Sequence, residues 1–287
     1  MAVHDHRYRA YTGPRTAAAR RLLILPRYAF RSVFRSRIFT GFYAVCFAFP
    51  AGAAIWIYLH YNLSALAGLR LDASQLLAID AAFFESLMGY QAFFLGFLVA
   101  LLAGPGLVSA DLANNALPLY LSRPCSRTQY LLGKAAVLVV LLSAITWIPG
   151  VILFLFQGSL AGAEWLGGNL RIGLAIVASS GMFIVVISLL SLALSAHVRR
   201  KVLAQAALLG IVFGGTVLAK TVNLLFGTSL GNVLSLPQVL ATVWSRLYGT
   251  AADTGLAPGA AWTSLVAVSL LSLALLYRKL TAYEVAR

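Results

Sequence analysis

Long apolar runs, each about as long as a membrane crossing, recur along the chain. A helix needs about 20 mostly apolar residues to cross the hydrocarbon core of a bilayer. The runs therefore predict an all-α integral membrane protein in which an N-terminal segment, residues 1–37, precedes a six-span domain, residues 38–287. The six predicted transmembrane helices cover about residues 38–59, 81–103, 131–156, 170–196, 202–226 and 260–277.

Composition agrees with this pattern. Of the 287 residues, 61% are hydrophobic and only 10% are charged, whereas soluble domains carry about 45–50% apolar and ~25% charged residues. So few charges cannot cover the surface of a water-soluble globule, and that class is excluded. The two cysteines, Cys46 and Cys125, are too few for a disulfide framework or a metal cluster.

The basic residues predict the orientation of the spans. Lysine and arginine collect on the cytoplasmic flanks of membrane proteins. Of the 22 in this chain, nearly all precede the first span, lie in the second-to-third or fourth-to-fifth connection, or follow the last span. We therefore expect both termini to be cytoplasmic in a multi-pass protein of the plasma (inner) membrane. The exceptions are Arg70, Arg171, Lys220 and Arg246.

The segment before the first span has the pattern of an amphipathic helix. Pro26 is expected to start a fresh helix, because proline suits the first helical turn. Arginines then recur every four residues beside a stripe of apolar residues, as in a helix that lies among lipid headgroups. The alternative is a basic flank that only sets the topology. The candidate membrane-interface residues are Arg27, Arg31, Arg35, Phe30 and Phe34.

The connection at residues 104–130 is the most informative cytoplasmic segment. Gly104, Pro105 and Gly106 are expected to end the second span, and Ser109 or Asp111 to cap a short helix that reaches about Tyr120. A turn at 122–124 follows, and Ser126 with Gln129 forms a capping-box pattern that opens the next helix. The segment predicts a docking site for a soluble partner; the alternative is an ordered loop.

The fifth-to-sixth connection, residues 227–259, is long, external and only partly polar. Its apolar periodicity predicts a short helix that dips into the outer leaflet, with Trp244 and Tyr248 at the membrane interface. The alternative is an ordered external loop. The fourth-to-fifth connection is so short that it predicts an antiparallel helix hairpin.

Polar residues inside the spans are few. Glu85 and Gln91 are candidates for a substrate path, and local hydration or an interhelical hydrogen bond are the alternatives. No carboxylate lies at mid-depth of the predicted spans, which argues against a proton- or sodium-driven transporter. Small residues on the fourth and fifth spans favour close helix packing. They are Ser188, Ser191 and Ser195 on the fourth, and Gly210 and Gly214 on the fifth.

We find no sequence sign of an enzyme. Residues 214–221 approach a phosphate-binding P-loop, but Ala219 stands where the motif requires its second glycine, and no strand precedes the segment. No paired carboxylates or zinc-binding HExxH pattern is present in the sequence. We expect no catalytic residue, metal or cofactor in this chain.

The segment at 104–134 contains an acidic residue, a Leu-Tyr-Leu-Ser-Arg-Pro turn at 119–124, a Ser-Arg pair, an aromatic residue and Gly-Lys at 133–134. In this pattern it resembles the permease subunits of ABC-2 type ATP-binding-cassette transporters. Where many members carry Glu and Gly-Thr-Leu, this chain has Asp111 and 115–117 Asn-Ala-Leu. The resemblance implies docking of an ATPase at Asp111, Asn115, Tyr120, Ser122, Arg123, Pro124 and Arg127.

The resemblance also implies the partners and the activity. Two permease copies, expected as a homodimer, would pair around a central cavity, and two separate ATPase subunits would bind ATP and Mg²⁺ below them. The chain is then the membrane-spanning subunit of an ATP-driven exporter, with no nucleic acid among its partners. The alternative is a membrane scaffold or assembly factor that recruits a cytosolic partner without moving a substrate.

Overall fold

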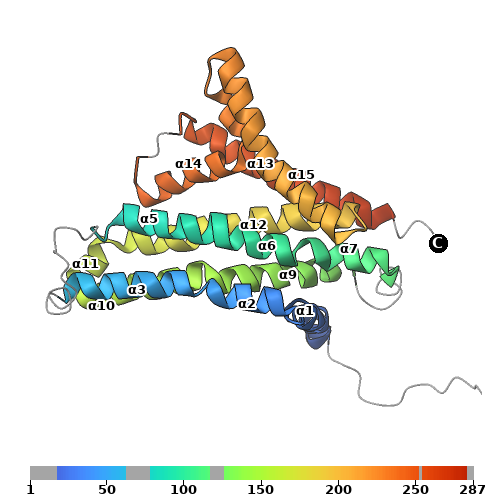
Figure 1. Cartoon of the computed structure of the whole chain (residues 1–287), viewed down its shortest axis with the longest axis horizontal. Helices are drawn as coiled ribbons and strands as arrows, with labels where there is room; N and C mark the ends of the chain where they lie inside the picture. Colours follow the sequence, from blue (N-terminus) through green and yellow to red (C-terminus); the bar gives the residue numbers. More distant parts are fainter. Residues whose placement is uncertain (1–17, 63–77, 117–125, 252–253, 283–287) are drawn as a thin grey trace, which may run out of the picture.

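The computed structural model describes residues 18–62, 78–116, 126–251 and 254–282, and it is built of helices (Figure 1). Six of these helices are long and apolar enough to cross a membrane, which confirms the predicted six-span, all-helical fold. They are Arg37–Tyr61, Ala81–Ala113, Thr128–Ala161, Leu170–His197, Lys201–Phe226 and Pro258–Lys279.

The first three spans are interrupted and the last three are continuous. The first consists of α2 (Arg37–Val45) and α3 (Ala48–Tyr61). The second runs through α5 (Ala81–Gly89), a π-helix η2 (Tyr90–Gly96), α6 (Phe97–Ala103) and α7 (Pro105–Ala113). The third joins α9 (Arg127–Ile145) to α10 (Trp147–Ala161). The last three are α12 (Leu170–His197), α13 (Lys201–Phe226) and α15 (Pro258–Ala282).

Shorter helices occupy the two ends of the bundle. The helix α1 (Ala18–Phe34) lies beside α9 at the end that also holds α7 and the last turns of α15. We call this the α7 end. The helix α11 (Ala163–Gly168) and the start of α5 lie at the opposite end, which we call the α11 end (Figure 1). The two ends of the described chain therefore share one side, as an even number of crossings requires.

The helix α12 forms the centre of the bundle, and α13 leaves it. In Figure 1, α13 starts at the α7 end and then diverges from α12, so the predicted hairpin opens into a wedge. A short helix η3 (Leu230–Leu234) and the helix α14 (Leu236–Tyr248) pack between α13 and the bundle. The far end of α13 has exposed apolar residues, among them Leu224 and Phe226.

Two expected helix boundaries are wrong. The helix α1 continues through Pro26 instead of starting there. Proline removes only one backbone donor, and α1 is held against α9, where Gly133 lets Leu25 and Pro26 come close. Likewise the second span does not end at Gly104–Gly106: after a single turn residue it continues as α7 to Ala113.

The predicted helix in the fifth-to-sixth connection is α14, but its aromatic residues differ from the prediction. Trp244 and Tyr248 are almost fully buried, at 1% and 2% exposure. Their spacing gives α14 one apolar face, and such a face has the same periodicity whether it meets lipid or protein. The face packs against α5, α12 and α15.

Candidate functional site

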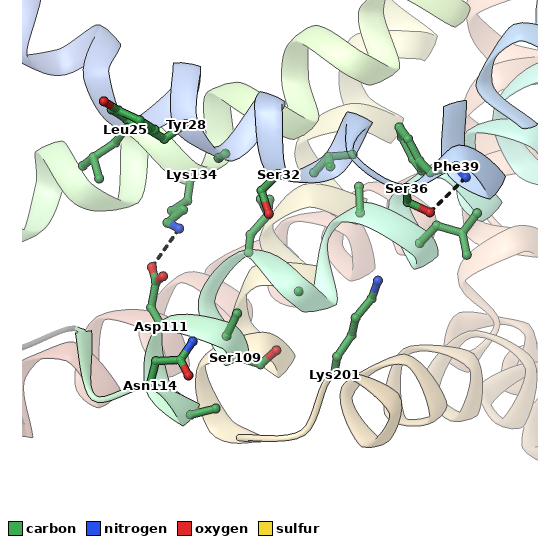
Figure 2. Close-up of a pocket in the computed structure, with 18 of the residues that line it drawn as sticks. Leu25, Tyr28, Ser32, Ser36, Phe39, Ser109, Asp111, Asn114, Lys134 and Lys201 are labelled. Atoms are coloured by element: carbon green, nitrogen blue, oxygen red, sulfur yellow. Dashed lines mark hydrogen bonds and ion pairs between the residues drawn. The ribbon is translucent and has the colours of Figure 1, made fainter. Parts of the chain in front are cut away.

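An ion pair fixes α7 to α9 at the α7 end. The Lys134 Nζ lies 2.7 Å from the Asp111 Oδ2, and the two side chains are only 8% and 15% exposed (Figure 2). The Tyr130 hydroxyl donates to the same carboxylate oxygen at 2.7 Å, and the Lys134 ammonium lies 5.6 Å from the centre of the Tyr130 ring. Asp111 therefore joins two helices and does not cap a helix as predicted.

A serine hydroxyl joins α7 to α12. The Ser195 Oγ accepts hydrogen bonds from the backbone N–H groups of Val108 (3.1 Å) and Ser109 (2.9 Å) and donates to the Pro105 carbonyl at 2.7 Å. The first N–H groups of a helix lack partners within it, so Ser195 supplies a cap from a neighbouring helix. Ser109 itself is buried within α7 and donates back to Pro105, so it is not the predicted cap.

The approach of these two helices requires a glycine. A Cβ added to Gly104 would lie 2.1 Å from the Ser191 Oγ and 2.8 Å from the Ala100 carbonyl oxygen. The serine face of α12 thus supports close packing, as predicted. Gly210 and Gly214, by contrast, have nothing within 4 Å of an added Cβ in the described chain, so their face is open.

A cleft of about 1070 Å³ lies between α1 and α7 at this end. Figure 2 shows Lys201 pointing into it, opposite Ser36, with Asp111 and Asn114 along one edge. Arg27 and Arg31 are exposed, whereas Phe30 packs against the core, so α1 is amphipathic. The remaining interface candidates, Phe34 and Arg35, are exposed at and just after the end of α1.

Only part of the predicted docking segment falls within the described residues. Asp111 is in the ion pair, and Asn115 is exposed with a left-handed backbone (φ 51°) just after α7. The predicted capping box of Ser126 and Gln129 is present and opens α9. Arg127 begins α9, but its side chain is outside the description. Tyr120, Ser122, Arg123 and Pro124 lie outside the described residues.

The second span carries a polar crosslink at the level of its π-helix. Gln91 is 1% exposed, and its Nε2 donates to the carbonyl oxygens of Cys46 (2.9 Å) and Ile145 (2.6 Å). Cys46 stands at the break between α2 and α3, and Ile145 at the break between α9 and α10. One amide thus ties together the irregular points of three spans. Gln91 therefore makes interhelical hydrogen bonds, which was the alternative to a place in a substrate path. It lines neither of the two pockets described here.

A second cavity, of about 550 Å³, opens in the wedge between the second span and α13. It is lined almost wholly by apolar side chains, and Glu85 is the one acidic residue among its described lining. The Thr250 hydroxyl donates to the Glu85 Oε2. Phe93 and Trp244 lie with ring centres 4.8 Å apart at its wall. Its aromatic lining consists of Tyr90, Phe93, Phe94, Phe97, Phe183, Phe213 and Trp244.

Sequence reasoning missed most of this geometry. The ion-pair partner of Asp111 is more than twenty positions away, on another helix, and no local pattern in the sequence links the two residues. The cavity draws on four separate segments, so no local pattern encodes it. The available signal was that Glu85 stands alone among apolar residues.

The sequence model of the family described as ABC-2 family transporter protein matches residues 27–277, nearly the whole chain. The chain belongs to this family and is a multi-pass membrane protein. No curated protein matches the chain.

Proposed function

We propose that the chain is the permease subunit of an ATP-driven exporter and that a separate ATPase docks at its α7 end. The observation that carries the proposal is the Asp111–Lys134 pair within an ABC-2 family chain, because it ties α7, the described part of the predicted docking segment, to α9 of the third span. In this proposal the α7 end and both termini face the cytoplasm of a cell whose plasma (inner) membrane holds the protein. This chain contributes no catalytic residue; ATP and Mg²⁺ bind to the ATPase.

The contacts of α7 provide a route from the docked ATPase to the spans. A displacement of α7 acts on α9 through the Asp111–Lys134 pair and on α12 through Ser195. The α9–α10 break, the α2–α3 break and the π-helix meet at Gln91, and such irregular points are where helices bend. The α7-end halves of these spans can therefore tilt about this level.

Transport then follows from two states of unequal affinity for the substrate. A ligand or motor shifts a conformational equilibrium only through its differential affinity for the two states. The cavity between the second span and α13 includes Phe183 and Ile187 of α12, the helix that α7 contacts. Motion of α12 would change the walls of the cavity, and this link favours a transporter over a scaffold.

A second copy of the chain and two ATPase copies complete the proposed complex. The support for a homodimer is the open face of α13, where Gly210 and Gly214 leave the backbone accessible. Small residues at such a face let a second helix approach closely. Disulfide crosslinking between copies carrying Gly214→Cys is expected to yield a dimer, and Gly181→Cys, on α12, is the control.

Co-purification tests the docking. The wild-type permease is expected to retain the ATPase in mild detergent, and Arg123→Glu with Arg127→Glu to release it while the spans still insert. Retention of the ATPase by this variant, with transport intact, would contradict docking at this segment. A scaffold would keep the partner but show no substrate-stimulated ATP hydrolysis in reconstituted vesicles, so that assay separates the two functions.

A further inference from the structure

The cavity between the second span and α13 has the chemistry of a site for one class of ligand. We propose that it binds a lipophilic cation, with the cationic head at Glu85 and the apolar body along the aromatic wall. The proposal deepens the transport function and rests on it for its physiological meaning. The binding itself is a property of this chain alone.

The cavity is elongated along one helical stripe. Its lining from the second span runs from Glu85 through Gly89 and Phe93 to Phe97. Glu85 and Phe97 are twelve helical steps apart, which is at most roughly 18 Å at the α-helical rise of about 1.5 Å per residue. Glu85 lies one turn inside the α11 end of the span, whereas Phe97 lies near its middle. The carboxylate is therefore at one end of the cavity and the apolar wall extends from it toward mid-membrane.

The carboxylate has no cationic partner among the described residues. Thr250 occupies one of its oxygens, and the ion pair at the α7 end involves Asp111 instead. Within the described chain, no lysine, arginine or histidine lines this cavity. A carboxylate beside an apolar wall attracts a cation and repels an anion, and both interactions strengthen as the local dielectric constant falls.

The aromatic wall adds to the same selectivity. Cations are attracted to the faces of aromatic rings, most strongly to those of tryptophan. Trp244, Phe97 and Phe183 form the buried part of the wall, with exposures of 5% or less. Tyr90 and Phe94 are 66% and 64% exposed and stand at the opening. A molecule that dissolves in the bilayer can therefore enter sideways, past these two rings.

The volume leaves room for such a molecule. Ligand pockets commonly measure about 300–1,000 Å³, and this one measures about 550 Å³. Gly89 lies on its wall, and the nearest atom to an added Cβ is a Phe93 ring carbon at 4.0 Å. A larger side chain at this position would enter the cavity and need not displace the protein around it.

The test uses tetraphenylphosphonium as the probe and the full chain in lipid nanodiscs, with empty nanodiscs as the baseline. Equilibrium dialysis of the radiolabelled cation is expected to show saturable binding to the wild type. Glu85→Gln is expected to weaken binding about tenfold, the effect of losing one charge-assisted contact. Gly89→Leu is expected to weaken it at least as much, because it fills the cavity.

Two matched controls accompany these variants. Glu164→Gln removes an exposed carboxylate at the same end of the bundle, and Gly181→Leu adds the same bulk to α12 outside the cavity. Both are expected to bind like the wild type. Thermal melting of each variant identifies any loss of folding. The size-matched anion tetraphenylborate is expected not to compete.

Three outcomes would overturn the proposal: no saturable binding to the wild type, wild-type affinity in folded Glu85→Gln and Gly89→Leu, or equal competition by the anion. The first result would mean that lipid or a second copy fills the cavity, and the last that the site is merely apolar. The assay contains no ATPase and no ATP. Absence of binding alongside intact ATP-driven transport would therefore refute this inference alone. Cation binding by a permease that retains no ATPase in the co-purification test would refute the proposed function alone.

Discussion

The junction of α7 with α9 and α12 and the wedge between the second span and α13 use their acidic residues in opposite ways. At the junction, the Asp111 carboxylate pairs with Lys134 and accepts from Tyr130, and Ser195 caps the N-terminal part of α7. In the wedge, the one partner of Glu85 among the residues that the structure describes is the Thr250 hydroxyl, and a wall of aromatic rings lies beside it. A carboxylate whose charge is compensated within the protein serves rigidity, whereas one left without a cation is available to a ligand.

The contrast predicts that Asp111→Asn and Glu85→Gln, which each remove one carboxylate charge, differ strongly in their effect on stability. Asp111→Asn leaves the Lys134 ammonium buried without its partner, and breaking a buried ion pair in this way costs about 3–5 kcal/mol. We expect the largest loss of thermal stability in detergent from this variant.

The double variant Asp111→Leu with Lys134→Met is the control for that loss. It removes both charges together, and replacing a buried pair by apolar residues is often neutral. We expect it to recover most of the stability. A double variant as unstable as Asp111→Asn would show that packing, and not the ion pair, holds α7 in place.

The second largest effect is expected at the α7–α12 contact. Gly104→Ala places a Cβ 2.1 Å from the Ser191 Oγ, and overpacking of this kind costs about 1–3 kcal/mol. Gly106→Ala is the matched control, since its Cβ meets only the flexible Lys201 side chain at 3.5 Å. Melting curves that do not distinguish the two variants would mean that the helices separate easily here.

A smaller effect is expected at the polar crosslink of the three interrupted spans. Gln91→Leu loses two hydrogen bonds, to Cys46 and Ile145. Interhelical hydrogen bonds in membranes average about 0.6 kcal/mol each, so the loss should be roughly 1 kcal/mol. Gln205→Leu, which loses one bond to Leu101, should cost about half as much. Equal melting temperatures for Gln91→Leu and the wild type would show that the hydrogen bonds of Gln91 do not stabilise the packing of the three spans.

The smallest effect on stability is expected in the wedge. Glu85→Gln retains an oxygen that accepts from Thr250 and removes a charge that no described cation compensates. Its free energy of unfolding should change by less than about 0.5 kcal/mol, as for substitutions outside packed networks. A loss as large as that of Asp111→Asn would show that the Glu85 carboxylate stabilises the fold, as the Asp111 carboxylate does.

The transmembrane helices of this protein could be predicted from the sequence because an apolar run of bilayer length is typical of a membrane-spanning helix. The continuation of the second span past Gly104 and of α1 through Pro26 could not, because packing against α12 and α9 overrides the local helix-breaking signal. Trp244 was predicted on an apolar face, but the sequence does not reveal whether lipid or protein covers that face. The Asp111–Lys134 pair depends on helix positions that only the fold determines.

Docking of an ATPase at the α7 end can be tested by photo-crosslinking from a single position. Ala113 is exposed in the last turn of α7, and Ala163 is exposed at the start of α11, at the opposite end of the bundle. With a benzophenone amino acid at 113, irradiation of cells is expected to yield an adduct of the permease with the ATPase, and with the same residue at 163 to yield none. An ATPase adduct from position 163 and none from 113 would show that the ATPase does not dock at the α7 end.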